Sequence, residues 1–366
     1  MKKVLALLLV LVLCFGALAG CTSSQEPAGT DEPENTGDDT VYQLDMTTHD
    51  PNTSAVAVAL QAWVDQLREE TNGRLDITIH YNGALASMQD AAAMTQSGGC
   101  DLMWGVCAAN SRYFTLLEIL NTPCIGLQNS LQGTYVVQKM YNEMPLIKAE
   151  FDSMGLHLLA AHSNALSAFI STKQFEKVDD FKGEVLRANT DTYNALCTAL
   201  GSSTMACSGG EMYENFSKNV MSGTMIDVTV IAATKSYEVA PYLMDYNFGT
   251  NSGFVAMNED VYNSLPADLQ EKLDSSFESL SYAIATSCND NVKELYGGVF
   301  DENMTVYPAS EELVNAFESI TKDQIWSNWE KVVAERGGDP EAMFAQIQDY
   351  LAEGAAKYGA EYNWVQ

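Results

Sequence analysis

The sequence predicts an α/β fold made of two α/β units followed by long helices. Three observations predict it: strand and helix patterns alternate in the first unit, the alternation recurs in a second unit, and the last third is helical. Alternation of this kind favours a sheet that is covered by helices. The length of 366 residues suits two domains or one large one.

The first unit has the order β-α-β-α-β. Apolar residues at helical spacing over residues 56–67 predict a helix, which Asn72-Gly73 ends. Apolar and polar residues alternate over residues 75–81, which predicts a half-buried strand. A short helix around Met88 and Met94, an apolar strand at 102–106, a helix at about 133–154 and a strand at 156–161 follow.

The second unit repeats this alternation with shorter elements. We expect strands at 185–188, 203–206, 226–231, 242–248 and 254–257, and helices at 190–200 and 211–222. The strand at 226–231 is predicted from its β-branched residues. The stretch 247–253 is polar and contains glycine, as a hinge crossing between two lobes would be.

The last third is predicted to be mainly helical. One apolar stripe runs from Leu269 to Ile284 on a helix that starts at Pro266. If this helix continues to about Leu295, it is ~45 Å long, enough to touch two lobes. A strand at 304–307, a helix after Ser310 and a final helix around 343–351 complete the chain.

The charge balance excludes some classes of partner. The chain has 49 acidic and 19 basic side chains, a net charge of −30, and only five arginines. A nucleic-acid binder needs a basic surface that neutralises phosphates, so nucleic acid is not expected as a partner. Docking on an anionic lipid surface through charge is excluded for the same reason.

The N-terminus predicts export and a lipid anchor. Lys2 and Lys3 precede an apolar run at residues 4–15, too short for an ordinary spanning helix. Residues 18–21, Leu-Ala-Gly-Cys, look like the lipobox of bacterial lipoproteins, in which Cys21 is lipidated and becomes the mature N-terminus. A plain secretory signal with a chance cysteine is the alternative. Residues 22–40 are acidic and polar and are predicted to form an extended tether.

No catalytic, metal or cofactor motif is present. The sequence has no Gly-x-Ser-x-Gly, His-Glu-x-x-His, Cys-x-x-Cys, Walker loop or strand-linked Gly-x-Gly-x-x-Gly. Six cysteines follow Cys21, mostly between apolar neighbours, and we expect buried free thiols. Among the four histidines, His49 follows the first strand, where ligands approach α/β sheets. We therefore predict neither an enzyme nor a cofactor.

From Thr71 onward, the chain resembles the extracytoplasmic solute-binding subunits of TRAP (tripartite ATP-independent periplasmic) transporters. Three blocks carry the resemblance together with a fourth, shorter match. The blocks are Thr-Asn-Gly-Arg at 71–74 with Tyr-Asn-Gly-Ala-Leu at 81–85 and Gly-Gly-Cys-Asp-Leu-Met at 98–103; Val-Asp-Asp-Phe-Lys-Gly-Glu-Val-Leu-Arg at 178–187; Glu-Met-Tyr at 211–213 with Gly223 and Asp227; and Leu-Pro-Ala-Asp-Leu-Gln at 265–270. They cover most of residues 42–300.

The resemblance implies a two-lobed fold like that of periplasmic binding proteins, with a long helix crossing both lobes. Together with the N-terminal pattern, it divides the chain into a lipoprotein signal peptide at 1–20, a tether at 21–40, lobe I at 41–160 completed by about 250–305, lobe II at 161–249, and C-terminal helices across the lobes at 306–366. It also implies that Arg187 grips the carboxylate of the ligand. A guanidinium suits this role because its planar fork makes two charge-assisted bonds to a carboxylate. A salt bridge from Arg187 to a neighbour such as Asp191 is the alternative.

The remaining candidate site residues follow from the family pattern and from departures from it. Residues 228–231, Val-Thr-Val-Ile, stand where the family has polar residues after the aspartate, so only Thr229 keeps a hydroxyl and Ile231 is apolar. Gly209 lies near the usual position of an aromatic lid residue. The resulting pocket is expected to be less polar than a sugar-acid or C4-dicarboxylate site. The other candidates for contact with the ligand are His49, Trp104, Asn110 and Phe248.

The sequence thus predicts a non-catalytic receptor, outside the cytoplasm and anchored to the cell membrane by its lipid. It would bind a small organic anion, in particular a monocarboxylate with an apolar or weakly polar body, and deliver it to the small and large membrane subunits of a TRAP transporter. The alternatives are the binding protein of an ATP-driven importer, a sensory ligand receptor, and an exported enzyme.

Overall fold

Ten strands form one sheet in the part of the chain that the structure, a computed structural model, describes, residues 40–359. Residues 1–39, which include the predicted signal peptide, Cys21 and all but the last residue of the predicted tether, and residues 360–366 lie outside it. The strands are β1 (Tyr42–Thr47), β2 (Leu75–His80), β3 (Leu102–Val106), β4 (Leu156–Ser171), β5 (Val185–Arg187), β6 (Ser203–Met205), β7 (Gly223–Asp227), β8 (Tyr242–Asp245), β9 (Thr250–Asn258) and β10 (Thr305–Pro308). Their order is β2-β1-β3-β9-β4-β7-β5-β6, and β8 pairs with both β4 and β10 off this path.

Fourteen α-helices cover this sheet within residues 40–359. They are α1 (Ala55–Glu70), α2 (Ala91–Gln96), α3 (Ser130–Glu143), α4 (Pro145–Ser153), α5 (Asp191–Ala199), α6 (Gly209–Ser217), α7 (Val228–Ala233), α8 (Glu259–Ser264), α9 (Ala267–Ser275), α10 (Phe277–Tyr296), α11 (Val299–Asn303), α12 (Glu311–Ile320), α13 (Ser327–Glu335) and α14 (Pro340–Tyr358). Short 3₁₀ turns are η1 (Cys107–Asn110), η2 (Leu116–Asn121), η3 (Val178–Phe181) and η4 (Ser236–Glu238), and η5 (Thr321–Trp326) is a π-helix.

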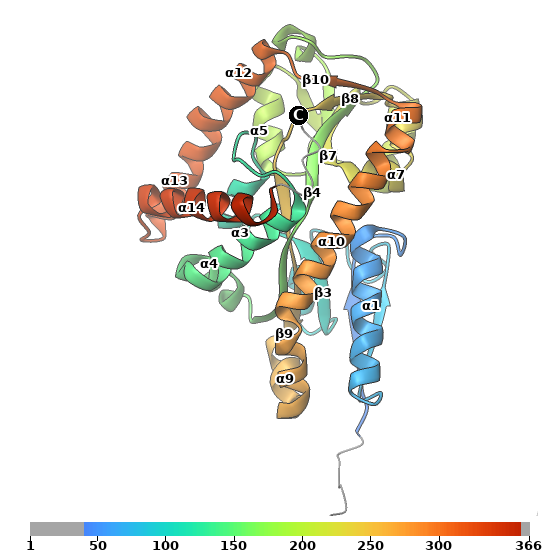
Figure 1. Cartoon of the computed structure of the whole chain (residues 1–366), viewed down its shortest axis with the longest axis vertical. Helices are drawn as coiled ribbons and strands as arrows, with labels where there is room; N and C mark the ends of the chain where they lie inside the picture. The colour runs from blue at the N-terminus through green and yellow to red at the C-terminus, as the bar shows by residue number, and fades with distance from the viewer. Residues whose placement is uncertain (1–39, 360–366) are drawn as a thin grey trace, which may run out of the picture. The chain divides into compact units, whose positions relative to one another are not determined.

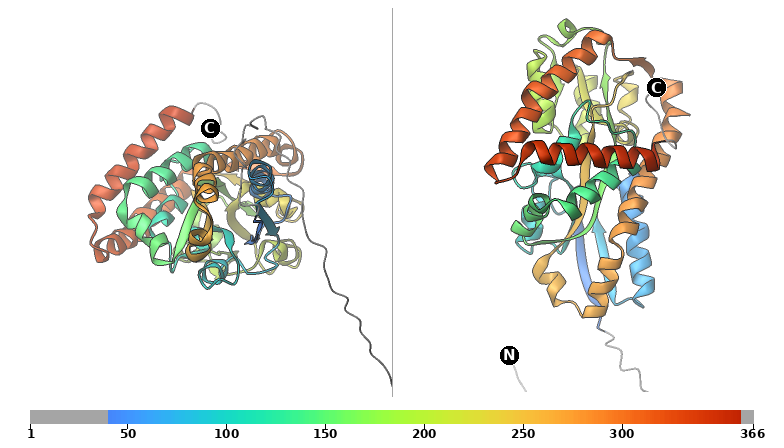
Figure 2. Two further views of the ribbon diagram at one scale, coloured as in Figure 1. Left: turned by 90° about the horizontal axis from the view of Figure 1, so that it is seen from below. Right: turned by 60° about the vertical axis from the view of Figure 1, so that its left-hand side comes forward.

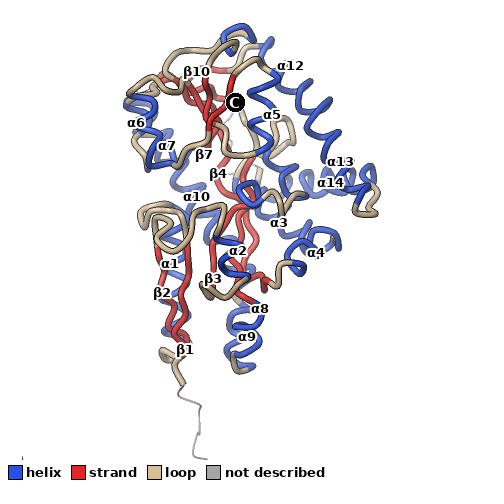
Figure 3. The backbone as a smooth tube through the Cα atoms, turned by 180° about the vertical axis from the view of Figure 1, so that it is seen from behind, coloured by secondary structure: helices blue, strands red, loops and turns tan. Residues whose placement is uncertain are grey.

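The sheet is built from two sets of parallel strands. We call β1–β3 with α1–α4 lobe I, and β5–β8 with α5–α7 lobe II. In lobe I, β1 pairs in parallel with β2 and β3; in lobe II, β5 pairs in parallel with β6 and β7. Figure 3 shows the two groups of strands and the segments that pass between them. This is the mixed α/β, two-lobed arrangement that the sequence predicts.

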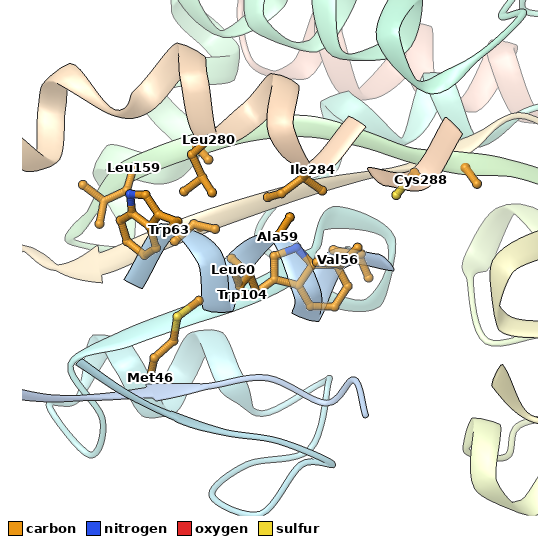
Figure 4. Packing of buried hydrophobic residues seen from close by; sticks show 14 of the residues in the cluster. Met46, Val56, Ala59, Leu60, Trp63, Trp104, Leu159, Leu280, Ile284 and Cys288 are labelled. Carbon is orange, nitrogen blue, oxygen red and sulfur yellow. The ribbon is translucent and has the colours of Figure 1, made fainter. Parts of the chain in front are cut away.

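Strand β4 and helix α10 run through both lobes. The first part of β4 pairs antiparallel with β9, and its last part pairs with β7 and β8. Helix α10 packs on α1 of lobe I and on α7 of lobe II (Figure 1). The apolar stripe that predicted this helix faces α1, with Leu280, Ile284 and Cys288 directed at the side of Val56, Ala59 and Trp63 (Figure 4).

The C-terminal helices contact both lobes. Helix α12 packs on α5 of lobe II, α13 on η2, and α14 on α3 of lobe I, as Figure 2 shows from the side of these helices. The indole nitrogens of two tryptophans fix this packing: Trp326 donates to Thr122 Oγ1 at 3.0 Å and Trp329 to the Leu116 carbonyl at 2.9 Å. None of the helices in residues 40–359 is long and apolar enough to span a membrane.

Three predicted elements differ in type or continuity from the structure, and two strands are longer than predicted, since β4 continues to Ser171 and β9 already starts at Thr250. Residues 228–231 form the start of α7, not the end of a strand, because Asp227 accepts a hydrogen bond from the Thr229 amide and caps a helix there. The expected continuous helix from Pro266 is broken at Ser276 into α9 and α10. The expected helix at 133–154 is two helices, because Pro145 cannot continue α3 and instead starts α4.

One serine on α10 completes the hydrogen bonding of β4. The register between β4 and β9 shifts between Leu158 and Ala160, and the buried Ala161 amide donates to Ser281 Oγ at 3.1 Å. Ser281→Ala removes that acceptor, and an unsatisfied buried amide costs ~1–3 kcal/mol. We expect the free energy of unfolding, measured by urea titration, to fall by this amount.

Ser279→Ala is the matched control on the same helix. Its hydroxyl is exposed and bonds only the Ser276 carbonyl, so we expect a change within about 0.5 kcal/mol. Equal effects of the two substitutions would contradict the assigned role of Ser281.

Candidate functional site

The carboxyl ends of the parallel strands in lobe II meet at one edge of the sheet. Arg187 ends β5, residues 206 and 207 follow β6, and Asp227 ends β7. Ligands of open α/β sheets bind outside such ends. The site is therefore built upward from Arg187, Asp227 and the loops that follow these strands.

Arg187 is a buried guanidinium without a carboxylate partner in residues 40–359. The residue is only 8% exposed, and its Nε donates a hydrogen bond to the Cys207 carbonyl at 2.9 Å. The alternative salt bridge to Asp191 is not formed, since Asp191 accepts from Ser111 Oγ at 2.9 Å instead. Burial lowers the pKa of Arg187, with the neighbouring Cys207 opposing the shift. An arginine remains charged over any physiological pH, so this guanidinium is a buried positive charge without a carboxylate partner in residues 40–359.

His49 follows the carboxyl end of β1 in lobe I and packs against Trp104, which lies in the middle of β3. Their rings are 4.8 Å apart, and Trp104 Nε1 donates to His162 Nε2 at 2.9 Å. Burial lowers the pKa of His49, and the nearby Asp50 opposes that shift. His49 is thus neutral at pH 7, and Trp104 is a buried residue of the hydrophobic core, 2% exposed, that packs against the His49 ring.

Asn110 is buried beside the loop that leads into α2. Its amide nitrogen donates to the carbonyls of Met88 and Val106, at 3.2 and 3.1 Å. Its Oδ1 is enclosed and has no hydrogen-bond partner in the described part of the chain. This leaves one acceptor unused next to the strand ends of lobe I.

Helix α7 holds the residues after Asp227 in a different orientation from a strand. Thr229 donates from both its amide and its hydroxyl to Asp227 Oδ1, at 2.8 and 2.7 Å. Ile231 is fully buried in the hydrophobic core. Burial, and then the charge of Asp50, raises the pKa of Asp227 to about 7. Asp227 is therefore a structural cap whose ionisation is costly.

Gly209 and Phe248 occupy two different environments. Gly209 starts α6 and lies beside α7, where an added Cβ would be 3.6 Å from Thr234 Cγ2, an ordinary contact. Phe248 is fully buried and packs against Tyr246 and Phe317 in the core of lobe II. The structure thus does not bring Phe248 together with Arg187, whereas Gly209 begins the helix that follows Cys207.

A cavity of about 260 Å³, here called the strand-end cavity, lies directly after β5 and β6. Gln89 of lobe I closes it opposite segments of lobe II. Two hydrogen bonds hold the lobes together nearby, from Ser111 Oγ to Asp191 and from Asn121 Nδ2 to Thr190 Oγ1 at 3.3 Å. The lining residues are Gln89, Ala188, Asn189, Thr190, Asp191, Asn194, Thr204, Met205 and Ala206.

None of the residues that line this cavity was among the predicted site residues, and Arg187 lies next to the lining without being part of it. Asn189 binds the backbone of Cys207 from both ends of its amide, at 2.8 and 3.2 Å, and so shapes the loop beside Arg187. The position of residues 188–191 in the sequence could have identified them as lining residues, since they immediately follow the strand that contains Arg187. Gln89 had no such signal because its place depends on how the lobes meet.

Comparison with known proteins identifies the family. Residues 46–331 match the family model described as bacterial extracellular solute-binding protein, family 7. A solute-binding protein of Chromohalobacter salexigens is 23% identical over 194 residues, which cover 50% of this chain and 54% of that protein. The C4-dicarboxylate-binding periplasmic protein DctP of Rhodobacter capsulatus is 22% identical over 236 residues, covering 63% of this chain and 70% of that protein.

Solved structures share the fold. A TRAP periplasmic solute-binding protein of Bordetella bronchiseptica with bound mandelate has a TM-score of 0.77 at 19% identity, covering 85% of this chain and 99% of that one. A Bordetella pertussis receptor that binds pyroglutamic acid has a TM-score of 0.75 at 18% identity, covering 85% and 100%. A Rhodoferax ferrireducens protein with copurified benzoate has a TM-score of 0.74 at 18% identity, covering 87% and 100%.

The raised pKa of Asp227 predicts a pH dependence of stability. The folded state holds a proton on Asp227 up to about pH 7, whereas the unfolded state releases it near the ordinary pKa of 3.8. The stabilisation is complete below the unfolded pKa and is lost as pH rises through the folded one, at no more than about 1.4 kcal/mol per pH unit. We expect Asp227→Asn, which keeps the capping oxygen, to flatten the fall in unfolding free energy between about pH 4.5 and 7.

Asp349→Asn on the exposed face of α14 is the control. It should retain the slope of the parent protein in the same urea titrations. A slope in Asp227→Asn that equals that of the parent would show that Asp227 ionises normally.

Proposed function

Because the chain belongs to family 7 of the bacterial extracellular solute-binding proteins, we propose that it is the solute receptor of a TRAP-type transporter and binds a small monocarboxylate at Arg187. The proposal joins two independent supports, the family and the strand-end geometry. The family consists of binding proteins and not of enzymes, and the proposed role requires no reaction.

The unpaired guanidinium of Arg187 carries this proposal. A buried charge is stable only when it is paired and hydrogen-bonded. Within residues 40–359, no acidic side chain pairs with Arg187, and its one protein acceptor is a carbonyl on Nε. A ligand carboxylate would supply two charge-assisted bonds to the remaining N–H groups.

The charges around the strand-end cavity favour one carboxylate over two. Asp191 is the only charged residue in its lining. Arg187 is not part of this lining but directly precedes Ala188, so it is the basic group for one carboxylate. A second carboxylate would face Asp191 and find no basic side chain in the lining. Like charges in close contact disfavour binding, which discriminates against dicarboxylates.

The lining also bears on the body of the ligand. The expectation of an apolar body came from residues 228–231, but Val228 and Ile231 belong to the core. Three amides, Gln89, Asn189 and Asn194, line the strand-end cavity together with two threonines and small apolar residues. These groups favour a compact body that carries a hydrogen-bonding group. The volume of the strand-end cavity, about 260 Å³, is below the usual range of pockets for drug-sized ligands.

Known ligands of related structures fit this class. Pyroglutamic acid, mandelate and benzoate, bound by the three solved relatives, each have a single carboxylate on a compact ring-containing body. Pyroglutamate also carries a lactam. We therefore take a lactam or hydroxy monocarboxylate as the ligand class for this chain.

The family also suggests the partners and the place of action. We propose that the small and large membrane subunits of the transporter receive the ligand, outside the cytoplasm. We further propose that Cys21 carries the lipid that anchors the protein to the membrane, which rests on the lipobox pattern at residues 18–21. Delivery to a membrane permease favours a receptor held at that membrane.

Replacement of Arg187 tests the site. We expect Arg187→Ala to weaken binding of the carboxylate by ~2–5 kcal/mol in titration calorimetry, because one partner of a buried charge pair is lost. Arg187→Lys should also bind poorly, since an ammonium group lacks the bidentate fork. Arg68→Ala is the control, as Arg68 lies exposed on lobe I and pairs with Asp76. Unchanged affinity in Arg187→Ala would remove Arg187 from the site.

A matched ligand pair tests the chemical class. Pyroglutamate and cyclopentanecarboxylate have nearly the same shape, but only the former carries a lactam. We expect pyroglutamate to bind at least about tenfold more tightly, because each buried amide left unpaired costs ~1–3 kcal/mol. Glutarate should not bind, owing to Asp191. Tight binding of glutarate with none of either monocarboxylate would contradict the class and leave the receptor role intact.

A further inference from the structure

A second cavity, of about 320 Å³, lies on another face of α5. Residues 191 and 194 of this helix face the strand-end cavity, while Thr192 and Ala195 line the second one. Its other walls are η2 from lobe I and the C-terminal segments η5 and α13. A molecule bound there would contact lobe I, lobe II and the C-terminal helices at once. We call this the Glu118 cavity.

The Glu118 cavity has two carboxylates and no basic residue in its lining. Glu118 comes from η2 and Asp191 from the first turn of α5. The apolar part of the wall includes Ile119, Ile325 and Trp329. One side of the cavity is therefore acidic and the other is apolar, which suits a cation that has an apolar body.

Glu118 lacks the partners that buried carboxylates need. It is 9% exposed, neither of its oxygens accepts a hydrogen bond from residues 40–359, and Oε1 is wholly enclosed. The neighbouring Glu150 is also buried but, unlike Glu118, has such partners. It pairs with Arg336 and accepts from the amides of Thr115 and Leu116, at 2.9 and 3.2 Å. Buried carboxyl groups without a hydrogen-bond partner are rare, so the position beside Glu118 is open to a donor group of a ligand.

We propose that the Glu118 cavity is a second ligand site, for a small primary amine whose ammonium group pairs with Glu118 and Asp191 and whose apolar body lies against Ile325 and Trp329. The site shares Asp191 with the strand-end cavity, but Glu118 and the apolar wall belong to the Glu118 cavity alone. An ammonium group donates three hydrogen bonds, so it can serve both carboxylates and a nearby amide such as Asn328. A carboxylate ligand would instead be repelled.

The charged groups around Glu118 give this binding a defined pH dependence. Burial, and then the charges of Asp191 on α5 and Glu150 on α4, raise the pKa of Glu118 to about 8. Arg336, at the C-terminal end of α13, forms an ion pair with Glu150. Burial is the main cause that raises the pKa of the Cys107 thiol on η1 well above its ordinary value. The empty site thus holds a proton at pH 7 that an ammonium ion must displace. Binding should release close to one proton and tighten as pH rises.

Titration calorimetry of the full chain with phenethylamine tests the proposal. We expect saturable binding to one site that tightens roughly eightfold between about pH 7 and about pH 8.5, from the deprotonated fraction of Glu118. Neutral 2-phenylethanol should bind at least tenfold more weakly. No saturable binding at millimolar amine, or equal binding of the alcohol, would overturn the proposal.

Variants locate the binding. Glu118→Gln keeps the shape of the side chain, and should weaken phenethylamine binding at least tenfold and remove its pH dependence. Ala195→Leu fills part of the cavity but leaves both carboxylates in the sequence, and it should also abolish binding. Glu330→Gln, on the exposed face of α13, controls for general attraction to an acidic protein. Retained binding in both Glu118→Gln and Ala195→Leu would overturn the site.

Arg187→Ala separates this proposal from the carboxylate receptor. That variant should bind phenethylamine as the parent protein does, whatever happens to carboxylate binding. Loss of amine binding in Arg187→Ala would place the amine at the strand-end site and overturn the assignment to the Glu118 cavity.

Discussion

The shared strand β4 is the constraint on which both cavities depend. All of its residues except His157 are buried, and its main chain is paired first with β9 and then with β7 and β8. The pairing of β4 with β9 shifts register between Ser163 and Leu166. Side chains make a hydrogen bond between the two strands there, from Ser163 Oγ to Thr250 Oγ1 at 2.9 Å. Because β4 pairs with strands of both lobes, it holds the lobes in a fixed relative position. This register shift lies just before the part of β4 that pairs with β7 and β8. The carboxyl ends of the parallel strands are therefore held close enough for Gln89 to close the strand-end cavity from lobe I.

Patterns that depend on local sequence predicted the fold well. The two α/β units, the apolar stripe of α10 and the Ser310 cap of α12 all follow from periodicity and capping, which neighbouring residues determine. The failures lie where local signals compete. The run at residues 228–231 has strand propensity, yet the side chain of Asp227 starts a helix there, because a satisfied N-cap and core packing override a weak preference.

The site was harder to predict than the fold because its residues come from distant segments. Arg187 could be identified from a family block, and its burial without a carboxylate partner agrees with a role that awaits an anion. Phe248 was expected near the ligand on its aromatic character alone, but such residues mostly fill cores, as this one does. Glu118 stands within the apolar run Leu-Leu-Glu-Ile-Leu, and an acid at such a place was a signal that the sequence reasoning did not use.

The scarcity of arginine explains how this chain handles its buried acids. With five arginines and 49 acidic residues, few buried carboxylates can be paired as Glu150 is with Arg336. Burial raises the pKa of Asp227 to about 7, of Asp245 to about 6 and of Glu118 to about 8. Each of these groups favours the folded state at low pH, and each contribution is lost as pH rises through its folded pKa. Protonation therefore takes the place of ion pairing inside this protein. The arginine at the end of β5 is the reverse case, a buried cation without an acidic partner in residues 40–359, and the proposed carboxylate ligand would pair with it.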